Sequence, residues 1–311
     1  MHDPGLADTT TGNDSYAIHD LALLHYFTTV SFAKLDTIAS QRLIWRDTIV
    51  QLGFREPFLL HGILAIAAIH QAQDIGSDDG ELRRIATQHQ NVGLAEYRSA
   101  LSNLNSSNVC ALFAFACLTV LHTFAIADIA TAGGALQEMI HCICLVRGIR
   151  TVISPHFEAL AQTELGPLLQ NGRRSAKGAG GEVPDILKLC SLVNNEGRPE
   201  HKQALLDAIE HCHTAFLGAV CSDEERSALA QIFTWPVLLS ADFISLLKAE
   251  DDLALIILSH YSVLFYLKRD CWWLRGWYDS LLRDIEARVM PEFQHWLDWP
   301  KEIKHRRFLQ I

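Results

Sequence analysis

The sequence lacks the excess of basic residues that nucleic-acid-binding proteins carry. Its 311 residues include 26 Lys and Arg against 36 Asp and Glu, which gives a net charge of −10 at pH 7. A protein that binds the phosphates of DNA or RNA presents a basic face, and the sequence shows no cluster of basic residues of that kind. We therefore expect no direct contact with nucleic acid from this chain.

Proline and glycine are also scarce, at 9 and 18 residues, whereas 49% of the residues are hydrophobic. This composition excludes a fibrous or disordered chain and is typical of a globular protein. The eight cysteines lie in apolar stretches without a C-x-x-C pair, and the N-terminal residues show no signal-peptide pattern. Both features indicate a reducing compartment, cytoplasmic or nuclear, where buried cysteines behave as small hydrophobic residues.

Short catalytic and metal-binding motifs are missing too. The sequence contains no glycine-rich phosphate loop, no G-x-S-x-G and no H-E-x-x-H. His211 and His213 are two residues apart, so a helix would point them to different sides. The acidic residues between Asp74 and Glu81 lie in a polar, glycine-containing stretch that is typical of a solvated loop. We expect neither a metal nor a cofactor.

What the chain does have is helical periodicity. Apolar residues recur at spacings of three and four along most of its length, and we find no convincing run of alternating strand residues. Residues 1–16 are polar and lack periodicity, which predicts a disordered tail, and residues 170–184 predict a mobile loop rich in glycine, serine and basic residues. We predict an all-α protein in which residues 17–311 form a single large multi-helix domain.

One stretch needs a separate test, because Val109 to Ala127 contains nineteen residues without a charge. That length is near the minimum for a membrane span. However, Thr119, His122 and Thr123 interrupt the run, and no Lys/Arg cluster flanks it. We therefore predict a buried central helix and no membrane span.

Aromatic residues and histidines in apolar helices supply the candidate site residues. A pocket of aromatic side chains with one or two histidines suits an apolar ligand that carries a hydroxyl. The candidates for ligand binding are Phe113, Phe115, His122, Phe124, Tyr261 and Phe265, and the candidates for acid–base catalysis, if the chain is an enzyme, are His25 and His61. The alternative for each of them is an ordinary place in the core, with the histidines hydrogen bonded.

The segment CWWLRGW, Cys271 to Trp277, concentrates three of the seven tryptophans. Interpreted as a helix, it places Trp273 and Trp277 in one row and Trp272 in the neighbouring row, so its rings contact structure on two sides. An aromatic cage would need rings that converge on one point. The spacing therefore predicts a packing element of the core and not a ligand site.

Four stretches, in this order, resemble the regulatory domain of fungal zinc-cluster transcription factors. They are DLALLHYFTT (20–29), REPFLLHGILAIAAIH (55–70), LVRGIRTVI (145–153) and LALIILSHYSVLF with CWWLRGW (253–277). The resemblance is greatest to the sterol uptake control branch and covers about residues 18–300, including the closing WLDWP (296–300). It implies an all-helical domain that often dimerises and, in the sterol branch, a hydrophobic pocket that binds sterol and controls nuclear activity.

The sequence departs from the family in one respect. Family members carry a zinc cluster of six cysteines, C-x2-C-x6-C and its repeat, before this domain, whereas the first cysteine here is Cys110. We therefore expect a regulatory domain of a fungal transcription regulator that senses a lipophilic, sterol-like molecule and lacks its own DNA-binding zinc cluster. The expected partners are a sterol or a terpenoid- or polyketide-like molecule and a second copy of the chain in a homodimer.

Two alternatives to a sensor remain open. The first is a stand-alone enzyme of fungal specialised metabolism, a cofactor-independent cyclase or isomerase that acts on an apolar substrate in the former ligand pocket. Such an enzyme would use a buried histidine and a carboxylate as acid and base. The second is a dimerisation scaffold, which would have no pocket.

Overall fold

The computed structural model describes residues 18–36, 38–75, 80–169, 181–220 and 228–304. Within these ranges every regular element is a helix and no strand occurs, so the predicted all-α class is confirmed. The predicted tail, 1–16, lies outside the described residues, as does most of the predicted loop at 170–184.

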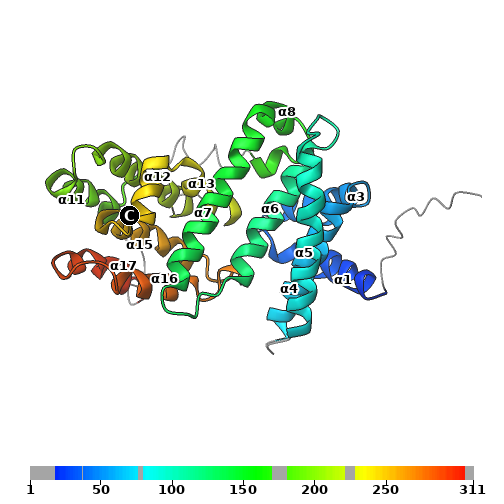
Figure 1. The fold of residues 1–311 in the computed structure, drawn as a ribbon, viewed down its shortest axis with the longest axis horizontal. Helices are drawn as coiled ribbons and strands as arrows, with labels where there is room; N and C mark the ends of the chain where they lie inside the picture. Colours follow the sequence, from blue (N-terminus) through cyan, green and yellow to red (C-terminus); the bar gives the residue numbers. More distant parts are fainter. Residues whose placement is uncertain (1–17, 37, 76–79, 170–180, 221–227, 305–311) are drawn as a thin grey trace, which may run out of the picture.

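The N-terminal helices form one end of the molecule, and α6 separates them from the rest (Figure 1). The elements of this part are α1 (Ile18–Thr29), η1 (Ser31–Lys34), α2 (Ala39–Leu43), η2 (Ile44–Thr48), α3 (Ile49–Gly53), α4 (Pro57–Asp74), α5 (Gly80–Leu101) and α6 (Val109–Ile126). Helix α4 packs along α5 and also contacts α1 and α6. Its first turn contains Pro57, where the missing N–H has no helical acceptor to lose.

The helices after α6 make up the rest of the molecule, and most of those from Pro184 onward lie on the opposite side of α7 (Gly134–Ile153) from α5 (Figure 1). Their elements are α7 (Gly134–Ile153), η3 (Ser154–His156), α8 (Phe157–Ala161), α10 (Pro184–Leu187), α11 (Leu189–Glu196), α12 (Lys202–Val220), α13 (Ala228–Leu238), α14 (Ala241–Lys248), α15 (Asp252–Leu267), η4 (Trp272–Leu274), α16 (Trp277–Glu286), η5 (Pro291–Leu297) and α17 (Asp298–Glu302). One continuous hydrophobic core joins the two ends.

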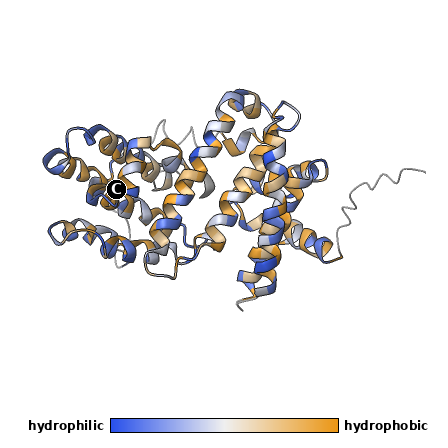
Figure 2. Ribbon diagram, in the orientation of Figure 1, coloured by the Kyte–Doolittle hydropathy of each residue, from blue (hydrophilic) through white to orange (hydrophobic). Residues whose placement is uncertain are grey.

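The charge-free run at residues 109–127 forms α6, a central helix of this core. By length and composition α6 could cross a membrane, but 78% of that stretch is buried against other helices. Figure 2 shows the contrast between the apolar residues along α6 and the polar outer side of α5. Because α6 is apolar all round, it fits a position with neighbours on every side.

Side-chain caps fix the ends of several helices. Asp251 accepts hydrogen bonds from the backbone N–H groups of Leu253 and Ala254 at the start of α15, as expected for an N-cap carboxylate. The buried carboxylate of Asp284, on α16, accepts from the N–H groups of Gly133 (2.9 Å) and Leu136 (3.2 Å) at the start of α7. This second contact ties two helices that are far apart in the sequence.

The tryptophan-rich segment is not a helix, so the helical row expected for Trp273 and Trp277 is wrong. Trp272 to Leu274 form a short 3-10 turn, and Gly276 adopts φ 81° immediately before α16 begins. Glycine adopts this left-handed conformation without steric cost, and it redirects the chain between the tryptophans. The prediction of a packing element is confirmed, because all three tryptophans are buried.

The three tryptophans nevertheless reach different neighbours. Trp272 stacks on His70 with ring centroids 4.6 Å apart, and Trp273 stacks on Phe233 at 5.7 Å. Trp277 donates its Nε1 hydrogen to the carbonyl of Phe124 at 3.0 Å. The segment therefore joins α4, α6 and α13 within the core.

Candidate functional site

A cavity of about 560 Å³ lies between α6, α7, α8 and α13. Its volume falls within the range of about 300–1,000 Å³ found for small-molecule sites. Most of its lining is apolar, and the lining residues are Trp45, Phe113, Cys117, Val120, Val146, Ile149, Arg150, Ile153, Ser154, Phe157, Glu158, Leu168, Leu169, Phe233, Thr234, Val237 and Leu238. Its physical character therefore suits a lipophilic molecule with few polar groups.

The polar residues of the cavity gather where it opens to solvent. Arg150, Ser154 and Glu158 are exposed, and Thr234 is half-buried. The Arg150 guanidinium donates a hydrogen bond of 2.7 Å to the carbonyl of Val237, which joins α7 to the end of α13. These residues form the mouth of the cavity, whereas Trp45, Phe113 and Val120 are buried.

A proline inside α13 shapes one wall of the cavity. Pro236 has no N–H for the carbonyl of Ile232, four residues earlier. The hydroxyl of Tyr261, on α15, donates to that carbonyl instead. Trp235 stacks on Tyr261 with ring centroids 4.1 Å apart and donates its Nε1 hydrogen to Ala208 of α12 at 2.8 Å. Helix α13 is therefore held to α12 and α15 from the core side.

Of the six predicted ligand-binding residues, the cavity brings in Phe113. Phe115, two residues away, points to α4 and α5, where Gly62 and Gly93 make room for its ring. A Cβ atom added at Gly62 or Gly93 would come within 2.8 Å or 2.7 Å of that ring. The ring of Phe115 is therefore enclosed by two helix backbones, outside the lining of this cavity.

Phe124, Tyr261 and Phe265 form an aromatic cluster behind the cavity wall. Phe265 makes edge contacts with Tyr261 at 5.3 Å and with Phe124 at 6.3 Å, and Phe124 lies 5.7 Å from Phe233, which lines the cavity. His122 is buried elsewhere on α6, and burial lowers its pKa to about 4. None of these four residues is among those that line the cavity.

Several lining residues have no obvious signal in the sequence. Trp45 lies in the π-helical turn η2, between α2 and α3, and such turns recur at functional sites. Leu168 and Leu169 follow α8, and Thr234 precedes the proline of α13. Arg150 is the exception, because a cation close to the end of an apolar helix is conspicuous in the sequence.

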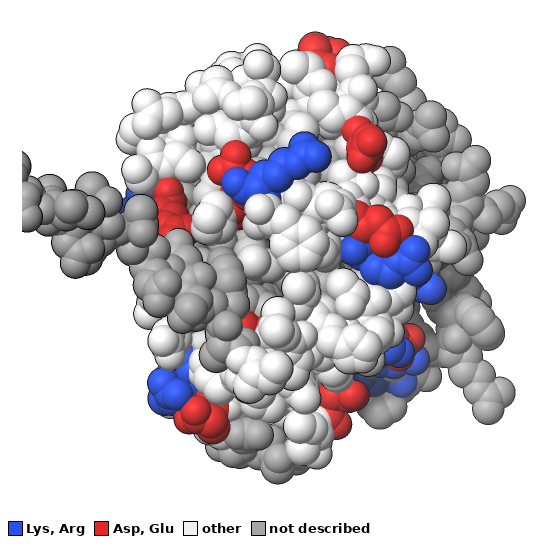
Figure 3. Space-filling model, turned by 90° about the vertical axis from the view of Figure 1, so that its right-hand side faces the viewer, with Lys and Arg blue, Asp and Glu red and all other residues white. Residues whose placement is uncertain are grey.

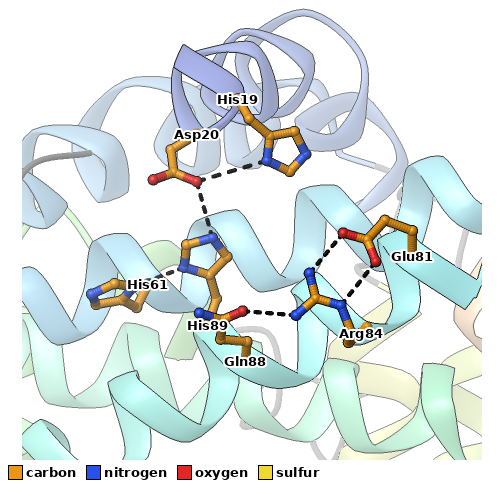
Figure 4. Close-up of polar contacts among 7 residues, drawn as sticks. All are labelled: His19, Asp20, His61, Glu81, Arg84, Gln88 and His89. Carbon is orange, nitrogen blue, oxygen red and sulfur yellow. Dashed lines mark hydrogen bonds and ion pairs between the residues drawn. The ribbon is translucent and has the colours of Figure 1, made fainter. Parts of the chain in front are cut away.

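The two histidines proposed for catalysis lie in different settings. His25 is exposed on α1 and lines neither described cavity. The Nδ1 atom of His61, on α4, lies 2.9 Å from Nδ1 of His89, on α5. The Nε2 atom of His89 lies 3.2 Å from a carboxylate oxygen of Asp20, on α1, and His19 is 3.9 Å from the same oxygen (Figure 4).

The two Nδ1 atoms of His61 and His89 are close enough to share one hydrogen bond, so only one of them carries a hydrogen. Asp20 favours the His89 tautomer with hydrogen on Nε2, which leaves Nδ1 of His89 to accept from His61. Burial lowers the pKa of His89, and Asp20 opposes this shift. Asp20 also lines a smaller cavity of about 270 Å³ whose other walls are apolar, Leu21 and Phe54 among them.

One of the two histidines of α12 has a backbone partner. His213 Nε2 accepts a hydrogen bond of 3.0 Å from the backbone N–H of Val183, while Cys212 between the two histidines is buried. Among the described residues, no three His, Cys, Asp or Glu side chains are grouped so that they could hold a metal ion.

Comparison with known proteins shows similarity to fungal transcription factors. Residues 22–144 match the family described as fungal specific transcription factor domain. Sterol uptake control protein 2 of Candida albicans is 26% identical over 278 residues, which is 83% of this chain and 38% of that protein. The protein of the same name in Saccharomyces cerevisiae is 25% identical over 281 residues, 86% of this chain and 30% of that protein.

A further relative is the Zn(2)-C6 fungal-type transcription factor afumD of Aspergillus fumigatus. It is 22% identical over 259 residues, which is 81% of this chain and 68% of that protein. The chain thus spans between 30% and 38% of the two sterol uptake control proteins.

Proposed function

We propose that this chain, of which residues 22–144 match the fungal specific transcription factor domain, is a regulatory domain that senses a lipophilic small molecule in the cavity between α6, α7, α8 and α13. The cavity is the observation that carries the proposal, since it combines about 560 Å³ with a mostly apolar lining and a polar mouth. Two relatives are named for the control of sterol uptake, and this supports a sterol-like ligand over other lipophiles.

The ligand would act by shifting a population of conformations. A molecule that binds only the arrangement described above stabilises it over any arrangement in which α13 has moved. Helix α13 is suited to this because it lines the cavity with Phe233, Thr234, Val237 and Leu238 and also contacts α7, α12 and α15. Occupancy of the cavity would thereby reach the C-terminal half of the core.

We place the regulator in the cytoplasm and the nucleus, as a homodimer whose DNA contacts come from outside these residues. The face of α1, α4 and α5 supports the last point, because its basic side chains are few and interspersed with acidic ones (Figure 3). The net charge of −10 acts in the same direction.

A direct binding measurement tests the proposal. Dehydroergosterol absorbs where tryptophan emits, so we expect energy transfer from Trp45, which lines the cavity, to the bound sterol, and displacement by unlabelled ergosterol. A saturating ligand at about 100 times its Kd should add about 2.7 kcal/mol of stability and raise the melting temperature by roughly 5 °C. No binding by sterols or by lipophilic extracts of the source organism would refute the proposal.

Regulation is tested separately from binding. The chain is fused to a heterologous DNA-binding domain, and reporter transcription is measured in yeast while ergosterol synthesis is inhibited and then restored. We expect reporter output to change with sterol level. Reporter output that ignores sterol, from a chain that binds sterol in solution, would remove the regulatory part of the proposal.

One observation favours an enzyme as the second candidate function. The Asp20–His89–His61 chain lies beside an apolar cavity of about 270 Å³, and a carboxylate–imidazole chain can relay a proton in general acid–base catalysis. Incubation with lipophilic extracts and mass spectrometry would show turnover that His61→Gln abolishes and His25→Gln, the exposed control, retains. Equal turnover by both variants, or none by the natural chain, would exclude this role.

A further inference from the structure

Arg150 joins two walls of the cavity between α6, α7, α8 and α13 at an edge that faces solvent. Its guanidinium, on α7, donates a hydrogen bond of 2.7 Å to the carbonyl of Val237, on α13, and both residues line the cavity. Arg150 is exposed and Val237 is half-buried, whereas Trp45 and Phe113 of the same lining are buried. The bond therefore spans the rim of the cavity and not its interior.

The acceptor of this bond belongs to the end of a helix. Val237 and Leu238 are the last two residues of α13, and carbonyls in the last turn of an α-helix have no N–H of their own helix to accept from. The partial negative charge at that end of a helix also favours a cation. Arg150 therefore holds the end of α13 to α7 through a long, exposed side chain.

Pro236 separates this end of α13 from the part that is anchored in the core. Before the proline, Trp235 donates its Nε1 hydrogen to the carbonyl of Ala208 at 2.8 Å, and the hydroxyl of Tyr261 donates to the carbonyl of Ile232. Pro236 cannot supply the helical bond to Ile232, and bends in helices concentrate at prolines. The end of α13 can therefore pivot at Pro236 without breaking either anchor.

We propose that the hydrogen bond between Arg150 and Val237 is a latch, and that the end of α13, Val237 and Leu238, is a gate through which the ligand enters and leaves the cavity. While the bond is made, the gate is held to α7. When the bond breaks, the gate moves away from α7 and widens the opening between the two walls. Leu238 is already 36% exposed, so this movement sacrifices little apolar burial.

This inference rests on the proposed function, because it assumes that the cavity binds a lipophile, and it adds how exchange of that ligand is controlled. The latch is closed in the free and in the occupied protein, and the ligand passes only while it is open. The open population therefore multiplies the rates of entry and exit by the same factor, which cancels from Kd. A change in both rates at constant affinity distinguishes a gate from a residue that contacts the ligand.

Stopped-flow energy transfer from tryptophan to dehydroergosterol measures both rates, entry on mixing and exit on addition of excess unlabelled ergosterol. Arg150→Gln removes the charged donor and should raise kon and koff about threefold to tenfold each, the effect of one exposed hydrogen bond from a charged group, with Kd within about twofold. Pro236→Ala restores the helical N–H and stiffens the pivot, so it should lower both rates, by about twofold to fivefold.

The matched control is Arg147→Gln, which removes the same charge from α7 at a residue that does not line the cavity. It should leave kon, koff and Kd within about twofold of the natural chain. Melting temperatures are recorded for all three variants, because Arg150 also joins α7 to α13. If Arg150→Gln does not fold, Pro236→Ala decides: slower exchange supports the gate, and unchanged or faster exchange refutes it.

The outcomes separate this inference from the proposed function. If the natural chain binds no dehydroergosterol, the proposed function fails and the inference fails with it. If it binds, but Arg150→Gln exchanges the sterol at the rates of Arg147→Gln, the latch is refuted and the proposed function stands. If Arg150→Gln raises koff alone and weakens Kd, Arg150 contacts the ligand and the gate is refuted. Opposite changes in Arg150→Gln and Pro236→Ala, each at constant Kd, would establish the gate.

Discussion

Replacing Tyr261 by phenylalanine isolates one hydrogen bond that a proline has made necessary. The Tyr261 side chain is fully buried, and its hydroxyl donates to the Ile232 carbonyl that Pro236 leaves without a helical donor. Tyr261→Phe removes that donor without changing the packing of the ring. The Ile232 carbonyl then stays buried and unsatisfied.

The expected cost follows from this accounting. An unsatisfied buried polar group costs about 1–3 kcal/mol, and the site has no exposure through which water could replace the hydroxyl, so we expect about 2–3 kcal/mol. In a Pro236→Ala background the restored N–H at residue 236 can bond to Ile232. The same Tyr261→Phe change should then cost about 1 kcal/mol, which gives a coupling energy of about 1–2 kcal/mol.

Urea unfolding of the four proteins in this double-mutant cycle measures the coupling directly. Tyr266→Phe, on the same helix and half-buried, is the control and should show additive free energies of unfolding with Pro236→Ala. An equal cost of Tyr261→Phe in both backgrounds would refute the assignment of the hydroxyl to the proline gap. Folded Tyr261→Phe should also keep its ligand affinity within about twofold, since its hydroxyl is engaged inside the core.

The remaining predictions concern stability. Burial lowers the pKa of His70, His122 and His260 to about 4 each, whereas histidines of the unfolded chain have pKa values near 6.5 and are protonated first as the pH falls. The free energy of unfolding should therefore decrease as pH drops from about 6.5 to about 4, by roughly 1–2 kcal/mol per histidine at pH 5. Urea midpoints that do not fall between pH 7 and pH 5 would contradict this. Asp284→Ala should lower the free energy of unfolding by about 3–5 kcal/mol, because two N–H groups at the start of α7 lose the carboxylate that accepts from them. Asp284→Asn should lower it by about half as much. Equal free energies of unfolding for both variants would argue against the cap. Trp273→Ala should cost about 3–5 kcal/mol, as large core truncations do, and a Trp273→Ala variant that stays fully stable while losing ligand would overturn its assignment to packing.

The helical class could be predicted because periodicity is a local property of the sequence. The apolar run that forms α6 required only its length and its interrupting polar residues to be interpreted as a core helix. The backbone path of Cys271 to Trp277 was harder to predict, because the flanking residues suit a helix but Gly276 adopts φ 81°. The prediction that the tryptophans are buried was still correct, because burial depends on their hydrophobicity and not on which row of a helix they occupy.

The residues that line the candidate site were much harder to predict from the sequence than the helices. Phe113 and Phe115 are two residues apart on a helix that is apolar on every side, so periodicity gives no preferred face. The two glycines of α4 and α5 decide that Phe115 packs between helices, while Phe113 meets the cavity. Likewise, no residue near Tyr261 in the sequence indicates that its hydroxyl replaces the hydrogen bond that Pro236, 25 positions earlier, cannot donate.

The cavity itself arises from the tertiary arrangement. Its lining comes from η2, from α6, from the continuous stretch of α7, η3, α8 and the residues after α8, and from α13, and long stretches of chain separate η2 from α6 and α8 from α13. No spacing rule relates such segments, whereas each of them alone has the composition of ordinary core. A sequence can therefore indicate that a lipophilic pocket is plausible for this composition, but its lining requires the packed helices.

Blocking the cavity tests the central claim most directly. Ile149 is half-buried on the α7 wall, so Ile149→Trp should place an indole in the cavity, and Val92→Trp, at an exposed site on α5 that is not part of the lining, is the matched control. We predict that ergosterol binds the natural chain and Val92→Trp alike, and binds Ile149→Trp at least tenfold more weakly, at unchanged stability of the free protein. Equal ergosterol affinity of Ile149→Trp and Val92→Trp would contradict the account.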